Sequence, residues 1–258
     1  MSRALWLALA LLAGCATPAP EGPTSGTGPI VGEAGTPRNR ARVHTELATL
    51  YYARGNMSVA LEELRIAVDA DPGYATAHGI FGLVYMELRE NDLARQSFER
   101  ALRHAPEDPD INHNFGWFLC QTGREKDATP YFRRALANPL YPTPARTYAA
   151  AGTCALRIGQ LAQADDDLQR ALRVDPNQPT ALLQSALLRY RQSRFDEARR
   201  LMARHAQVAE TTPASLWLSL RIERRLGARA AELSYANQLR RRFPDSPEYQ
   251  SLRRGEYD

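Results

Sequence analysis

The residues of this chain that could do chemistry are its 3 cysteines and 5 histidines. Cys15 follows the apolar run LWLALALLA and ends the four-residue segment LAGC. Cys120 and Cys154 lie far downstream, and His113 precedes Cys120 by seven residues. A cysteine and a histidine form a nucleophile pair when a third group orients the histidine, and the sequence shows no such group near them. We therefore do not expect thiol catalysis.

The other polar candidates have structural explanations. His44 and His78 are 34 residues apart, a spacing that a repeat explains, and a metal site would need further ligands nearby. The carboxylates of Asp165 to Asp167 are expected in the first turns of a helix, where they complement its positive end. No P-loop or dinucleotide-binding glycine pattern occurs. The sequence therefore predicts no enzyme activity, no metal, no cofactor and no small-molecule substrate.

The composition is that of a globular protein with enough apolar residues for a continuous core. The chain has 258 residues, of which 44% are hydrophobic and 24% charged, and its net charge is +4. The basic residues mostly alternate with Glu and Asp, which is typical of solvated helix faces. No basic run is interleaved with aromatic residues, so we do not expect a nucleic-acid partner.

A repeating pattern of small, aromatic and proline residues organises the chain from about residue 39 onward. In the stretch 75–108 its positions hold Gly82, Tyr85, Ala94, Phe98, Ala101 and Pro106. The same positions 34 residues earlier hold Ala48, Tyr51, Ala60, Leu64, Ala67 and Pro72. Later copies follow, and the fourth is shifted by 36 because two extra residues lie in the loop NPLYPTPA, residues 138–145.

This pattern resembles the tetratricopeptide (TPR) repeat, a helix-turn-helix unit of 34 residues that buries its apolar face by stacking on its neighbours. The resemblance implies an all-α, right-handed superhelical solenoid of about six helix pairs over residues 39–258. Glycines in the turns are expected to adopt left-handed backbone conformations, and the last residues are expected to form a capping helix. The repeats are expected at 41–74, 75–108, 109–144, 145–178, 179–212 and 213–246.

The N-terminal segment predicts export and a lipid anchor. Residues 1–14 have the basic start and the apolar core of a signal peptide, and the core is too short to span a bilayer. The segment LAGC resembles the bacterial lipoprotein cleavage box, which implies acylation of Cys15; an ordinary signal peptide with a coincidental cysteine is the alternative. Ala16 in the next position implies sorting to the outer membrane. Residues 15–38 are rich in Pro, Gly, Ser and Thr, and predict a flexible tether.

The expected binding surface lies on the first helices of the repeats, which line the concave side of such a solenoid. Positions that face the groove in TPR domains hold Thr49, Tyr52, Leu83, Met86 and Trp117 in the first three repeats. Four of these five are apolar or aromatic, and exposed apolar clusters usually mark binding sites. A neighbouring helix or the tether could instead cover them. A second candidate, in the sixth repeat, consists of Trp217, Arg221, Arg224 and Arg225.

The two downstream cysteines occupy the first helices of adjacent repeats. A disulfide between Cys120 and Cys154 is one interpretation, but we expect two buried thiols, since free cysteine is among the most buried residue types.

Three segments narrow the resemblance to one family. They are HNFGWFLCQTGREKDA (113–128), the loop NPLYPTPAR (138–146) and the ending QLRRRFPDSPEYQSL (238–252). Together they resemble the PilF/PilW family of type IV pilus lipoproteins. The resemblance implies a pilotin, which binds the secretin subunit, brings it to the periplasmic face of the outer membrane and promotes its multimerisation. An adaptor lipoprotein that recruits envelope enzymes such as peptidoglycan hydrolases is the alternative.

Overall fold

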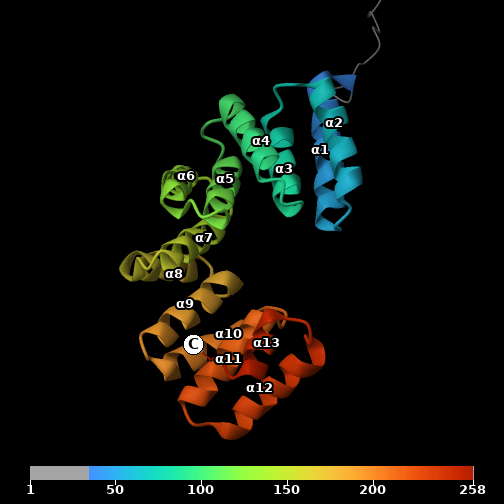
Figure 1. Cartoon of the computed structure of the whole chain (residues 1–258). Coiled ribbons are helices and arrows are strands. Elements are labelled where there is room, and N and C mark those ends of the chain that lie inside the picture. The colour runs from blue at the N-terminus through green and yellow to red at the C-terminus, as the bar shows by residue number, and fades with distance from the viewer. Residues whose placement is uncertain (1–34, 258) are drawn as a thin grey trace, which may run out of the picture.

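The computed structural model describes residues 35–257, which form thirteen α-helices and no strand (Figure 1). The signal peptide and Cys15 lie outside these residues, as does most of the expected tether. No helix in the described part is long and apolar enough to cross a membrane. The prediction of an all-α solenoid is confirmed.

Twelve of the described helices form six consecutive pairs, and a shorter thirteenth helix follows them. The first three pairs are α1 (Pro37–Ala53) with α2 (Met57–Ala70), α3 (Ala75–Glu87) with α4 (Asn91–His104), and α5 (Pro109–Gln121) with α6 (Glu125–Ala137). The next three are α7 (Pro144–Arg157) with α8 (Leu161–Val174), α9 (Pro179–Arg191) with α10 (Phe195–Val208), and α11 (Pro213–Arg225) with α12 (Arg229–Arg242). The last helix is α13 (Pro247–Arg254).

The helix crossings are close because glycine lies where two helices meet. A Cβ atom added to Gly82 would lie 2.6 Å from the ring of Phe98, and one added to Gly116 would lie 2.9 Å from that of Phe132. These contacts join the two helices of one repeat, so the small residue and the large residue of the pattern are partners. The buried core clusters each include residues of neighbouring repeats, so the core continues along the solenoid.

The turns inside the repeats share one left-handed residue. In four of them it is glycine, with φ between 73° and 79°, as the sequence predicts: Gly55, Gly123, Gly159 and Gly227. The second and fifth repeats use Arg89 (φ 62°) and Ser193 (φ 60°) at the same place. A non-glycine residue in this conformation costs about 1 kcal/mol, so the stacking of the helices imposes the turn even where the residue disfavours it.

The solenoid differs from the sequence prediction at its first helix. Helix α1 begins at Pro37 rather than residue 39, because Thr36 caps it by accepting a hydrogen bond from the backbone N–H of Asn39. At the other end α13 packs on α11 and α12, in the segment where the sequence predicts a capping helix.

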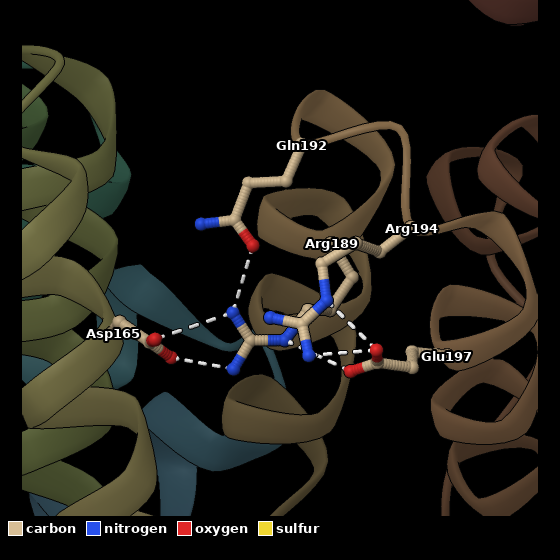
Figure 2. A network of polar contacts seen from close by, with 5 residues as sticks. All are labelled: Asp165, Arg189, Gln192, Arg194 and Glu197. Atoms are coloured by element: carbon tan, nitrogen blue, oxygen red, sulfur yellow. Dashed lines mark hydrogen bonds and ion pairs between the residues drawn. The ribbon is translucent and has the colours of Figure 1, made fainter.

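An ion network joins the fourth and fifth repeats and corrects one interpretation (Figure 2). Asp165 is the fifth residue of α8, so it lies in the early turns as expected but beyond the first turn, where the helix dipole acts most strongly; its carboxylate accepts hydrogen bonds from Arg189, at 2.7 and 3.2 Å. Arg189 also approaches Glu197, which pairs with Arg194. The three-aspartate segment is therefore explained by side-chain partners rather than by the helix dipole, since Asp166 pairs with Arg170 and Asp167 with Gln163.

Candidate protein-binding groove

The first helices of the second and third repeats bring three of the predicted groove residues onto one cluster. Leu83 and Met86 of α3 and Trp117 of α5 are half-buried, and all three pack against the core cluster that contains Phe98 and Phe118. Their inner sides are held by this aromatic core, while part of each side chain remains at the surface. The result is a fixed apolar patch rather than a set of mobile side chains.

Tyr52 lies on the adjoining core cluster of the first two repeats and is also half-buried. Burial raises the pKa of its hydroxyl; the negative charge of Glu87 adds to this shift and the positive charge of Arg146 opposes it. Charges on α3 and α7 therefore act on the side chain of Tyr52 on α1. The hydroxyl stays protonated at neutral pH and can donate a hydrogen bond to a bound segment.

Thr49 offers a bound partner less hydrogen-bonding capacity than its position in the repeat suggested. It is exposed, and its hydroxyl donates to the backbone oxygen of Thr45 in the same helix, at 2.8 Å. The hydroxyl is therefore already engaged, and the surface at this point is presented mainly by the methyl group.

The expectation of two free thiols is wrong, because Cys120 and Cys154 form a disulfide. The bridge joins α5 to α7, and both cysteines are buried. Their Cα atoms are 5.8 Å apart, which is within the usual range for a disulfide. The bridge fastens the third repeat to the fourth at the point where the 34-residue period is interrupted. It also removes Cys120 as a nucleophile.

A polar network that also joins α5 to α7 was not predicted from the sequence. Arg146 donates from Nε to Nε2 of His113, at 2.8 Å, and Nδ1 of His113 lies 2.8 Å from Oγ1 of Thr147. Because Nε2 accepts, Nδ1 carries the proton and donates to the threonine. Burial, with a smaller effect from the charge of Arg146, lowers the pKa of His113 to about 3. His113 is thus a neutral structural residue at physiological pH.

The same network fixes the two-residue insertion. Thr147 donates to the hydroxyl of Tyr141, 3.2 Å away, and the Tyr141 hydroxyl lies 3.5 Å from Asp110 on α5. Tyr141 is buried, whereas its neighbour Leu140 is 86% exposed. The insertion itself was visible in the sequence, but its contacts depend on the packing of α5 against α7.

The second candidate surface, in the sixth repeat, is occupied by the chain itself. Trp217 stacks on Tyr257 near the C-terminus, with ring centroids 5.7 Å apart, and the guanidinium of Arg224 lies 3.8 Å from the same ring. Arg221 and Arg225 lie over the rings of Tyr190 and Phe195. The arginines of this surface are therefore engaged in intramolecular packing, and the patch in the second and third repeats is the more open surface.

Comparison with known proteins identifies the family. The tetratricopeptide repeat model matches residues 45–109, 80–143 and 150–214. The chain is 31% identical over 216 residues to the type IV pilus assembly protein PilF of Pseudomonas aeruginosa, covering 83% of this chain and 86% of that protein. The chain belongs to the PilF/PilW family.

Solved structures of PilF/PilW proteins agree with this assignment. The structure of PilW, described as a widely conserved type IV pilus biogenesis factor, has a TM-score of 0.74 at 31% identity and covers 82% of this chain and 97% of that chain. The structure of PilF from Pseudomonas aeruginosa has a TM-score of 0.74 at 29% identity, with 85% and 99% covered. Both solved structures are thus matched over nearly their whole length, and each match covers more than 80% of this chain.

Proposed function

We propose that this protein is a non-catalytic, lipid-anchored pilotin of type IV pilus biogenesis. It binds the secretin subunit, holds it at the periplasmic face of the outer membrane and promotes its multimerisation. The observation that carries the proposal is the similarity to PilF, a type IV pilus assembly protein, over 83% of the chain.

Two features of the chain support export and anchoring. The segment LAGC at Cys15 has the form of a lipoprotein cleavage box, and each acyl CH₂ that enters the bilayer contributes about 0.8 kcal/mol, so several chains anchor a protein firmly. The disulfide between Cys120 and Cys154 fits an oxidising compartment such as the periplasm, because disulfides are rare in reducing compartments.

The groove supports a role in binding another polypeptide. Leu83, Met86 and Trp117 offer apolar surface, and Tyr52 adds a hydroxyl at the edge. An amphipathic helix or an extended segment of the partner can place its apolar side chains on such a patch. A clamp for a chain-terminal carboxylate is disfavoured, because the groove positions of the first repeat hold Thr45 and Thr49 rather than Lys and Asn.

Deletion of the gene tests the proposal in the cell. We expect a strain without the protein to lose most of its secretin multimers from outer-membrane fractions, and a plasmid copy to restore them. A copy carrying Cys15→Ala should leave the protein unanchored and fail to restore outer-membrane multimers. Normal multimer levels in the deletion strain would refute the pilotin role. Co-purification of peptidoglycan hydrolases in place of secretin would assign the adaptor role.

A further inference from the structure

The first repeat carries an apolar stripe that other repeats hide. Val43, Leu47 and Leu50 of α1 are 40%, 37% and 56% exposed. The residues at the same positions one repeat later, Ala77, Phe81 and Val84, are buried against the cluster that includes Leu64 of α2. The equivalents in the third, fifth and sixth repeats are also buried: Ile111, Phe115, Phe118, Ala181, Ser185, Leu188, Ser215, Ser219 and Ile222.

The stripe is open because no helix of the described residues precedes α1. A terminal repeat normally presents a polar outer face, and the other end of this solenoid is covered by α13. The N-terminal end instead presents three branched apolar side chains spaced by four and three residues, which places them on one face of α1. An exposed apolar face of this kind usually marks an interaction site, so we expect it to have an occupant.

The charges beside the stripe indicate what that occupant is. Arg40 and Arg54 continue the stripe at its two ends, and neither makes an ion pair within residues 35–257. No later repeat has a basic residue at either position; those residues are Tyr74, Asp108, Pro144, Gln178, Thr212, Leu88, Thr122, Ile158, Gln192 and Leu226. The exposed stripe therefore differs from the positions that receive a preceding repeat, since arginine flanks it on both sides. Arg38 and Arg42 of the same helix differ from them, because Arg38 pairs with Asp71 and Arg42 with Glu46.

Two protein occupants fit these observations poorly. In a symmetric dimer of this face, with the two α1 helices antiparallel, Arg40 would meet Arg54 of the other copy, and two unpaired arginines would repel each other. The chain's own residues 15–34 include prolines at 18, 20, 23 and 29, which is a poor sequence for the helix that covers this face elsewhere.

An anionic lipid surface fits both the exposed apolar stripe and the unpaired arginines at its two ends. Apolar side chains with arginines on both sides are the composition of helices that lie in a membrane interface, where arginine binds acidic headgroups. Helix α1 begins at Pro37, three residues before Arg40, and Cys15 lies only 22 residues before Pro37 in the sequence. We propose that α1 contacts the membrane directly, through Val43, Leu47 and Leu50 in the interface and Arg40 and Arg54 on acidic headgroups.

The proposal rests on the proposed function in one respect, the lipid anchor that keeps the first repeat near the bilayer. An anchored domain needs only weak affinity of its own, because the tether supplies a high effective concentration. The groove stays free, since Tyr52 lies about 200° around the helix from Leu50, and Leu83, Met86 and Trp117 lie on other helices. Membrane contact would thus fix the orientation of the solenoid without competing for the partner.

Vesicle binding by the unlipidated chain tests this contact. The protein from residue 15 onward, with Cys15→Ala, is sedimented with vesicles of phosphatidylethanolamine containing a quarter phosphatidylglycerol, and with vesicles in which phosphatidylcholine replaces the acidic lipid. We expect binding to the acidic vesicles that weakens at high salt. Leu47→Glu with Leu50→Glu should reduce it at least tenfold, and Arg40→Glu with Arg54→Glu should do the same.

Matched variants control for hydrophobicity, charge and folding. Leu140→Glu changes another exposed leucine, and Arg200→Glu with Arg241→Glu changes two other exposed arginines; both should bind like the parent. Absence of binding by the parent protein, or unchanged binding after the Leu47 and Leu50 changes, would overturn the proposal. So would dimerisation or secretin binding that depends on these leucines in place of vesicle binding. The vesicle-binding assay contains no secretin, and the Cys15→Ala protein carries no acyl anchor, so failure of vesicle binding is separate from failure of the pilotin role.

Discussion

Replacing Cys120 and Cys154 together with alanine should lower the free energy of unfolding by about 3–4 kcal/mol. The bridge closes a loop of 34 residues, and a closed loop of that length restricts the unfolded chain by this amount. It also joins α5 to α7 across the insertion, so its loss should weaken the junction between the third and fourth repeats most. Denaturant unfolding followed by circular dichroism measures the change.

Reductant provides the control for the cysteine variant. A reducing agent should destabilise the wild-type protein by a similar amount and leave the double alanine variant unaffected. Equal stability of the two proteins under oxidising conditions would show that the bridge contributes nothing to the fold. Alanine is the appropriate replacement because both sites are buried, and serine would add an unsatisfied hydroxyl.

Leu83→Arg should weaken partner binding at least a hundredfold and leave the solenoid folded. Leu83 packs against the same core cluster as Met86 in its own helix and Trp117 of α5. An arginine there places a charge on the apolar patch, where a bound partner would have to desolvate it. The protein itself tolerates the change better, because the side chain is only half-buried and its stem can lie along the surface. Titration against purified secretin segments measures the loss.

The matched control for Leu83 lies on the second helix of the same repeat. Leu93→Arg makes the same change on α4 at a leucine that is 42% exposed, and it should bind like the wild-type protein. Thermal unfolding of both variants separates loss of contact from loss of fold. Equal affinity of Leu83→Arg and wild type would exclude this patch as the binding site.

The fold was predictable because the residues that determine each helix pair lie within a single repeat. Helices α3 and α4 cross closely, which requires the small Gly82 on one helix against the large Phe98 on the other. The same pair recurs as Gly116 and Phe132 in the next repeat. Turn glycines such as Gly55 mark the left-handed residue directly. These are local relations, which a sequence shows without knowledge of how the repeats stack.

Contacts between repeats were harder to predict. Cys120 and Cys154 are 34 residues apart, but the period at this junction is 36, so they do not occupy equivalent positions. His113 and Thr147 have the same 34-residue offset and also meet, so both contacts join non-equivalent positions of two neighbouring repeats. Asp165 was misread for the same reason, since its partner Arg189 belongs to the next repeat. Only the stacking geometry reveals such pairs.

A crosslinking experiment from the groove tests most directly whether this protein binds the secretin through its concave face. A photoreactive phenylalanine analogue replaces Trp117 in the anchored protein, and a second variant carries it at the exposed position of Leu93 on α4. On irradiation of cells, the variant at position 117 should form a covalent adduct with the secretin subunit, and the variant at position 93 should not. Adducts from position 93 alone, or adducts from position 117 with other envelope proteins and none with the secretin, would contradict the assignment.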